Sequence, residues 1–248
     1  MNLRIFDTPD DAVRAAGRTI VQRAGLGDRS VIAISGGATP RPLYEMLGSP
    51  PLRDSLARRE VTWVLVDERY VPADNPQSNS RMIRETLFRG GIAEKHRFLD
   101  FDTSLDDPSA SARRFEETWS ALGLETLDIV LLGLGEDGHT ASLFPGTAVL
   151  DVQEGIAAAV YVPRLGQWRV TLTLPVIRSA TLRIVLATRE SKAAVVQEVA
   201  NGVDHPVARA MSGEGERWWL IDRAAAGRLS DVTGTTAGGD SRNEITRS

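Results

Sequence analysis

A single histidine, His139, lies in a glycine-rich segment, residues 133–146, that directly follows the apolar run Ile129–Leu132. Such a short apolar run is typical of a strand that is buried on both faces. In open α/β sheets, ligands bind outside the carboxyl ends of the strands, which is where this histidine falls. An unperturbed imidazole titrates at about pH 6.5 and can therefore accept a proton at neutral pH. We predict that His139 is a general base and that Asp137, or another nearby carboxylate, orients it.

A second loop has the features of an anion site. The apolar run at residues 31–34 is followed by Ser35, Gly36 and Gly37, and Thr39 stands just before a predicted helix. Paired glycines allow the backbone to approach an anion closely, and the free N–H groups of a helix start favour negative charge. The pattern matches neither the dinucleotide-binding fingerprint nor the P-loop. We predict that these four residues bind phosphate; a plain turn between strand and helix is the alternative.

Charged residues follow a third apolar run, residues 61–66. Asp67, Glu68 and Arg69 come directly after it, and Ser78 is placed to cap the next helix. Charges at the end of a buried strand are either paired with each other or directed at a ligand. Arg69 suits bidentate binding of phosphate, and Asp67 would hold a sugar hydroxyl or orient the base. An Asp–Arg pair that only braces the loop is the alternative.

Two further cations, Lys192 and Arg169, are candidates to complete a phosphate pocket, with a solvated surface position as the alternative for each. The two other histidines, His96 and His205, are expected on the surface, because no matching partner stands near them in the sequence. Three scattered histidines and no cysteine predict that there is no metal site.

These loops need a scaffold in which strands and helices alternate. Short β-branched runs do alternate with amphipathic stretches, which predicts βαβ units and an α/β fold with a mostly parallel sheet flanked by helices. A first strand is expected from about Leu3, with further strands at residues 31–34, 61–66, 97–99, 129–132, 157–162, 181–187 and 218–221, and a strand or loop at 170–173. Helices are expected at residues 9–24, 79–88, 108–123 and 191–199, and from Asp222 to about residue 229.

Length and composition predict one domain over residues 1–229, because no linker rich in Pro, Gly or Ser precedes residue 230. Residues 230–248 are small, polar and glycine-rich, so a disordered tail is expected there. A net charge of −4 without a basic patch argues against nucleic acid or a membrane as partner. No signal peptide and no run of about 20 apolar residues is present. Together with the lack of cysteine, this predicts a cytoplasmic protein.

Five segments occur in an order that makes them informative together. They are Ser-Gly-Gly-Ala-Thr-Pro at 35–40, Asp-Glu-Arg-Tyr-Val-Pro at 67–72 with Ser-Asn at 78–79, Gly-Leu-Gly-Glu-Asp-Gly-His-Thr-Ala-Ser-Leu-Phe-Pro at 133–145, Glu-Ser-Lys-Ala at 190–193 and Trp-Trp-Leu-Ile-Asp at 218–222. In these segments the chain resembles the 6-phosphogluconolactonase family, which is related to the glucosamine-6-phosphate isomerase/deaminase family. The resemblance extends to about residue 229.

The resemblance implies a Rossmann-like α/β domain that hydrolyses 6-phospho-D-glucono-1,5-lactone to 6-phospho-D-gluconate, the second step of the oxidative pentose phosphate pathway. It implies a small-molecule sugar-phosphate lactone as the binding partner and no cofactor. We also expect a monomer or weak dimer. The family's catalytic histidine falls on His139, and its phosphate contacts fall on residues 35–37, Arg69 and Lys192, with Arg169 as a further candidate. Backbone N–H groups or Arg69 would stabilise the oxyanion. No covalent intermediate is expected, because the sequence places no base beside Ser35 or Ser142.

Two other functions stay open. Glucosamine-6-phosphate deaminases share the Asp-Gly-His triplet but typically continue Ile-Ala-Phe-Asn-Glu-Pro, where this chain has Thr-Ala-Ser-Leu-Phe-Pro at 140–145. They also have Asp-Glu-Tyr where this chain has Asp-Glu-Arg at 67–69, so both differences favour the lactonase. The second alternative is a non-catalytic sugar-phosphate-binding domain, as in some bacterial repressors. Such a protein normally carries a helix-turn-helix segment, for which the first predicted strand leaves no room.

Overall fold

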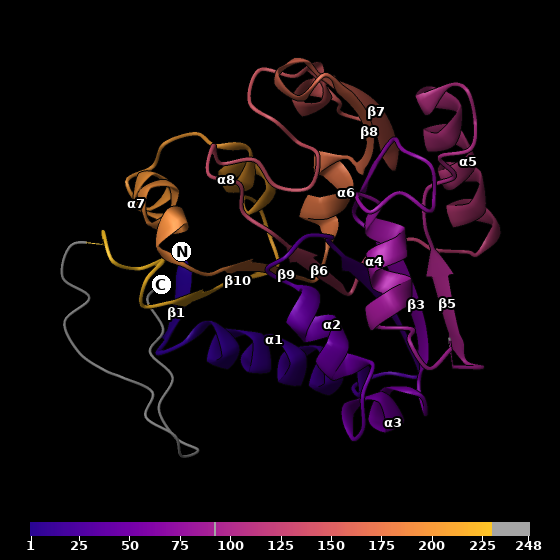
Figure 1. Ribbon diagram of the computed structural model, residues 1–248, viewed down its shortest axis with the longest axis horizontal. Helices are drawn as coiled ribbons and strands as arrows, with labels where there is room; N and C mark the ends of the chain where they lie inside the picture. Colours follow the sequence, from indigo (N-terminus) through magenta and orange to yellow (C-terminus); the bar gives the residue numbers. More distant parts are fainter. Residues whose placement is uncertain (92, 230–248) are drawn as a thin grey trace.

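A seven-stranded parallel sheet forms the centre of the computed structural model, which describes residues 1–91 and 93–229 (Figure 1). The strand order is β1-β10-β9-β6-β2-β3-β5. In chain order these strands are β1 (Asn2–Phe6), β2 (Arg29–Ile34), β3 (Glu60–Leu65), β5 (His96–Leu99), β6 (Ile129–Leu132), β9 (Leu182–Ala187) and β10 (Glu216–Asp222). The predicted α/β fold with a parallel sheet is confirmed.

The strand order reverses direction between β2 and β6. From β2 the chain moves outward to β3 and β5, and from β6 it moves the other way to β9 and β10. Ligands of open α/β sheets bind at such a reversal, outside the carboxyl ends of the strands. The loop that follows β2 is the one predicted to bind phosphate, and the loop that follows β6 contains the predicted base, His139.

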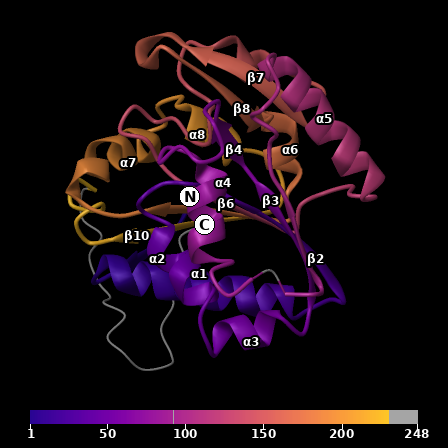
Figure 2. The same cartoon turned by 45° about the vertical axis from the view of Figure 1, so that its right-hand side comes forward.

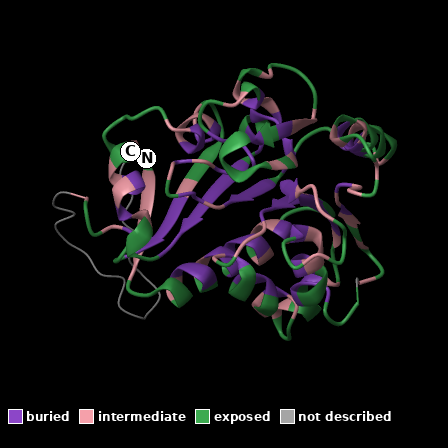
Figure 3. Ribbon diagram, turned by 45° about the horizontal axis from the view of Figure 1, so that its top comes forward, coloured by how far each residue is buried: buried purple, intermediate pink, exposed green. Residues whose placement is uncertain are grey.

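Helices cover both faces of this sheet (Figures 1 and 2). On one face lie α1 (Pro9–Ala24), α2 (Arg41–Leu47) and α3 (Leu52–Leu56), with α4 (Asn79–Thr86) packed against α2. On the other face lie α6 (Leu174–Ser179), α7 (Ala193–Ala200) and α8 (Pro206–Ala210). The strands between them are largely buried, as Figure 3 shows, and all four residues of β6 are buried. Burial on both faces explains why β6 is a continuous apolar run.

Several helix starts follow the sequence signals. The Thr8 side chain accepts a hydrogen bond from the N–H of Asp11 at the start of α1, and Pro9 is the first helical residue. The Ser78 side chain accepts from Arg81 N–H at the start of α4. Side-chain oxygens at this position satisfy N–H groups that have no partner within the helix.

A second, antiparallel sheet was not predicted. It contains β4 (Asp67–Arg69), β8 (Gln167–Leu172) and β7 (Ala157–Val162), in the order β4-β8-β7. β4 follows β3 almost directly, so the chain passes from the large sheet into the small one at Val66. The helix α5 (Pro108–Ala121) packs against β7 and β8. This arrangement brings Arg69 and Arg169 to opposite positions on neighbouring strands.

The predicted last helix from Asp222 is wrong. Asp222 ends β10, and residues 223–229 form turns. The Asp222 carboxylate does accept a hydrogen bond from Ala225 N–H, as a helix cap would, but it also accepts from the distant Arg189 N–H. Gly227 follows within five residues, and so short a segment cannot offset the cost of starting a helix. The predicted tail, residues 230–248, lies outside the described residues. Among the described residues no helix has the length and apolarity needed to cross a membrane.

Candidate active site

The loop after β6 folds back on itself and presents His139. The N–H of Gly135 donates to the His139 carbonyl at 2.8 Å, and the N–H of Gly138 donates to the Gly135 carbonyl at 3.1 Å. Gly138 has φ of 78°, a conformation that favours glycine. A side chain at Gly135 would collide with the His139 ring, so glycine is required there by space. Gly135 is therefore required by the packing of the His139 imidazole, and Gly138 by that of the His205 ring.

Asp137 is the partner of that imidazole. Its Oδ1 is in short hydrogen-bond contact with His139 Nδ1. Burial by itself raises the pKa of Asp137, but the hydrogen bonds from His139 outweigh it and lower the pKa. An ionised Asp137 can only accept, so Nδ1 carries the proton and Nε2 has a free lone pair. No described residue forms a hydrogen bond with Nε2. The pair therefore has the arrangement of an oriented general base.

Burial is the largest influence on His139 itself and lowers its pKa. Asp137 and Asp67 act in the opposite direction, and Arg164 adds to the lowering. The imidazole stacks on the Phe144 ring, with centroids 4.1 Å apart and an angle of 25° between the planes. A lowered pKa keeps the ring neutral at physiological pH, which is the form that a base needs.

Asp67 supplies a second carboxylate at this site, at the start of β4. Its Oδ2 accepts a hydrogen bond of 2.6 Å from the buried Ser142 hydroxyl, and its backbone carbonyl accepts from the Asn79 side chain. The alternative from the sequence, an Asp67–Arg69 pair that braces the loop, is not formed, because the Arg69 guanidinium donates to the Gln77 carbonyl instead. Contrary to the expectation from the sequence, a carboxylate does lie beside Ser142. The Ser142 hydroxyl donates its hydrogen bond to Asp67. None of the described histidines forms a hydrogen bond with Ser142.

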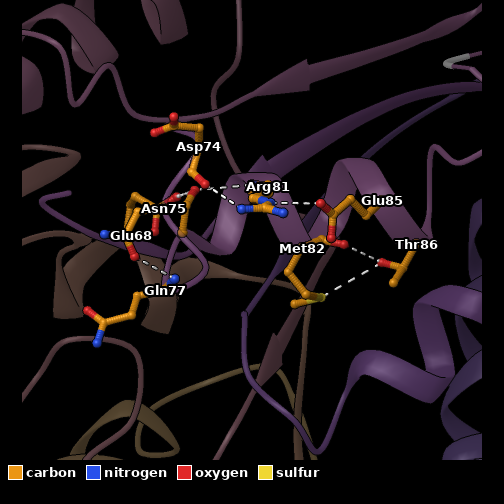
Figure 4. Close-up of polar contacts among 9 residues, drawn as sticks. Glu68, Asp74, Asn75, Gln77, Arg81, Met82, Glu85 and Thr86 are labelled. Atoms are coloured by element: carbon orange, nitrogen blue, oxygen red, sulfur yellow. Dashed lines mark hydrogen bonds and ion pairs between the residues drawn. The ribbon is translucent and has the colours of Figure 1, made fainter. Parts of the chain in front are cut away.

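Glu68 anchors the loop between β4 and α4. This buried carboxylate accepts from the N–H groups of Arg69, Asn79 and Ser80 and from the Ser78 hydroxyl. Burial raises the pKa of Glu68 in spite of these bonds. Further along α4, Arg81 links the Asp74 carbonyl to the Glu85 carboxylate (Figure 4). The Gln77 carbonyl, which accepts from the Arg69 guanidinium, thus belongs to a loop that is fixed at both ends.

The three predicted cations approach the site from three elements. Arg69 on β4 and Arg169 on β8 lie opposite each other, and the Nε atom of each is buried without a hydrogen-bond partner in the described part of the chain. Burial lowers the pKa of Arg169. Lys192 ends the 3-10 turn Glu190–Lys192 after β9, with Nζ 3.9 Å from Glu136 Oε1. Unpartnered arginine N–H groups are what a phosphate oxygen would bind.

The loop after β2, residues 35–39, is the remaining predicted part of the site. Ser35 is buried and its hydroxyl donates to the Leu131 carbonyl, so this side chain joins β2 to β6. Gly36 packs against the Asn79 side chain so closely that a Cβ would not fit, whereas Gly37, with φ of 107°, has open space beside it. Thr39 is partly exposed just before α2. The open Gly37 backbone is the part of this loop that an anion could approach.

Arg164 was not predicted as a site residue, and His96 and His205 are less exposed than expected. Arg164 comes from the tip of the β7–β8 hairpin, and its Nη2 lies 2.5 Å from Asp137 Oδ2. His96 is only partly exposed: Trp63 Nε1 donates to its Nδ1, and its Nε2 donates to the Leu56 carbonyl. His205 is also mostly covered: it packs on Gly138 and its Nε2 lies 2.7 Å from Glu198 Oε2. No signal in the sequence connects the two histidines with their hydrogen-bonding partners, which are 7 to 40 residues away.

Within residues 1–91 and 93–229, no group of His, Cys, Asp and Glu side chains could hold a metal ion. A cavity of about 1070 Å³ lies between α4, α5 and the segment after β5. None of the predicted site residues lines it, and its charged groups include the ion pair Arg84–Asp100. The candidate active site is therefore the group of side chains at the strand ends.

Fold and site together define an α/β protein with a histidine–carboxylate pair after a central parallel strand and two opposed arginines on the small antiparallel sheet. The family model for glucosamine-6-phosphate isomerases/6-phosphogluconolactonase matches residues 7–219. The chain belongs to this family. It is similar to a 6-phosphogluconolactonase from Synechocystis, with 34% identity covering 81% of this chain and 85% of that protein. A second one, from Nostoc, is 36% identical, covering 82% of this chain and 85% of that protein. The solved structure of 6-phosphogluconolactonase from Leishmania guyanensis matches with a TM-score of 0.81 and 27% identity, covering 92% and 98% of the two chains.

Proposed function

We propose that this chain hydrolyses 6-phospho-D-glucono-1,5-lactone to 6-phospho-D-gluconate, with His139 as the general base. The chain is then a carboxylic ester hydrolase of the pentose phosphate pathway. Membership of the family and the likeness to named 6-phosphogluconolactonases support the activity. The observation that carries the assignment of the base is the Asp137–His139 pair, in which no described residue forms a hydrogen bond with Nε2.

The reaction needs a water molecule, a base and an anchor for the phosphate. His139 Nε2 takes a proton from water while the water oxygen bonds to the lactone carbonyl carbon. The tetrahedral oxyanion then collapses, the bond from that carbon to the ring oxygen breaks, and the imidazolium returns the proton to the ring oxygen. The acid formed ionises at neutral pH and releases one proton. General-base assistance of this kind contributes about 10²–10⁴-fold in rate.

The other residues divide into two groups by their contacts. Asp137 occupies His139 Nδ1 and orients the ring, which leaves Asp67 to accept a hydrogen bond from a substrate hydroxyl. The phosphate is held by Arg69, Arg169 and Lys192, and by the loop of Ser35, Gly36, Gly37 and Thr39, which an anion approaches at the open Gly37 backbone. The unpartnered Nε atoms of the two arginines support this role. Donors from this group, or backbone N–H groups, stabilise the oxyanion.

The proposal includes a cytoplasmic location and a monomer or weak dimer. Cell fractionation and the concentration dependence of sedimentation test these two points.

The activity is tested by adding the protein to freshly generated lactone and following acid release above the uncatalysed rate. Acceleration that requires the 6-phosphate, and is absent with unphosphorylated glucono-1,5-lactone, supports the proposal. Ammonia release from glucosamine 6-phosphate without acceleration of lactone opening would replace it with the deaminase activity. Binding of the sugar phosphate with neither reaction would indicate a sensor.

A further inference from the structure

Arg164 stands at the tip of the β7–β8 hairpin, in the 3-10 turn Pro163–Leu165, which Gly166 ends with φ of 58°. Its Nη2 lies 2.5 Å from Asp137 Oδ2. The other oxygen of the same carboxylate, Oδ1, contacts His139 Nδ1. One carboxylate is thus shared between an imidazole and a guanidinium that come from different parts of the chain.

A second contact fixes the same guanidinium. Its central carbon lies 4.8 Å from the centroid of the Phe144 ring, the ring on which His139 stacks. The Arg164 side chain is 51% exposed, and a half-exposed arginine gains little from a single ion pair. The contacts with Asp137 and Phe144 together place the guanidinium beside the base.

We propose that Arg164 is a positioning residue for the hydrolysis: from the hairpin tip it holds Asp137 so that the carboxylate orients His139 without drawing a proton onto it. This role rests on the proposed function of His139. The charged groups that face His139 are Asp137 on its own loop, Asp67 on β4 and Arg164 on the hairpin. Arg169 on β8 lies over the same Phe144 ring, 5.5 Å from its centroid.

The charge balance around the imidazole explains the need for Arg164. Two carboxylates favour the protonated ring, which cannot act as a base. Arg164 opposes them and lowers the pKa of His139. Arg164 Nη2 forms an ion pair with Asp137 Oδ2, an oxygen that has no hydrogen-bond partner among the described residues. Arg164 therefore offsets the charge of Asp137 without breaking the hydrogen bond to Oδ1 that orients the ring.

Proton NMR titration of the imidazoles tests this role without substrate, since the chain has only three histidines. In Arg164→Ala, the titration midpoint of His139 should move to higher pH, while Arg164→Lys should keep it near that of the wild type. Arg14→Ala is the matched control, because Arg14 is 52% exposed and lies 2.7 Å from Asp11, far from the site in the sequence. An unchanged or lower His139 midpoint in Arg164→Ala would overturn the proposal.

Kinetics give a second readout. Between about pH 8 and pH 5.5, kcat/KM of Arg164→Ala should fall about 3- to 10-fold more than kcat/KM of the wild type does. An additional loss of this size is expected for removal of one partly screened charge. This additional loss should vanish in an Asp137→Asn background, where there is no charge to offset. A loss that is equal at all pH values and confined to KM would show a substrate contact instead, and would overturn the positioning role. If the wild type does not hydrolyse the lactone, the proposed function fails, and the titration still decides the role of Arg164.

Discussion

Replacing Gly135 by alanine should disable the site without removing any ionisable group. A Cβ at Gly135 would meet Asp137 Oδ1 at 2.6 Å and the His139 ring even more closely. Ordinary contacts begin at about 3.4 Å, so the pair must move by about 1 Å. The ring cannot yield easily, because it is stacked on Phe144.

A displacement of about 1 Å in a reacting group costs about 100-fold in rate. We therefore expect kcat of Gly135→Ala to fall about 100-fold, equivalent to about 2.7 kcal/mol in the activation free energy, with KM little changed. Overpacking should also lower the free energy of unfolding by about 1–3 kcal/mol. Steady-state acid release and urea unfolding measure the two effects.

Gly133→Ala is the matched control, two residues earlier in the same loop. A Cβ there meets nothing within 4 Å, so both kcat and stability should stay near those of the wild type. Wild-type kcat in Gly135→Ala, or an equal loss in Gly133→Ala, would refute the assignment of the loss to the His139–Asp137 geometry.

Two further predictions concern stability. Burial lowers the pKa of His96 and of His139 below about 6.5, so the unfolded state binds more protons than the folded state as the pH falls through that value. Urea unfolding should therefore show stability falling between about pH 7 and 5.5, less steeply in His96→Gln; an equal slope in that variant would contradict the role of His96. Arg189 has φ of 81° and ψ of 154°, a region that costs a non-glycine residue about 1–3 kcal/mol. Arg189→Gly should raise the free energy of unfolding by about 1 kcal/mol after the entropy cost of glycine. Arg189→Ala should give no gain in the free energy of unfolding. A glycine variant less stable than the wild type would contradict the presence of backbone strain at Arg189.

The elements that carry the site were predictable because each has a local signal. The strand Ile129–Leu132 is a continuous apolar run, and the structure gives it the predicted bounds. Thr8, Pro9 and Ser78 mark helix starts through their own hydrogen bonds or ring geometry. The glycines around His139 indicated close backbone packing, which the ring contact at Gly135 explains.

The parts that were missed depend on contacts between distant segments. Arg164 reaches Asp137 only because β7 and β8 pair into a second sheet, and nothing near Arg164 in the sequence announces that pairing. His96 looked like a surface residue because its partner, Trp63, lies 33 residues earlier on the neighbouring strand. The last helix was predicted from the cap-like Asp222, whose carboxylate is shared with the Arg189 N–H.

The most direct test of the account is acid release from the phosphorylated lactone by the wild type and by His139→Asn at the same protein concentration. The account predicts that the wild type accelerates the reaction and that the variant, with an unchanged thermal midpoint, loses about 10²–10⁴-fold in kcat. A folded His139→Asn variant with the turnover of the wild type would contradict the central claim that His139 is the base.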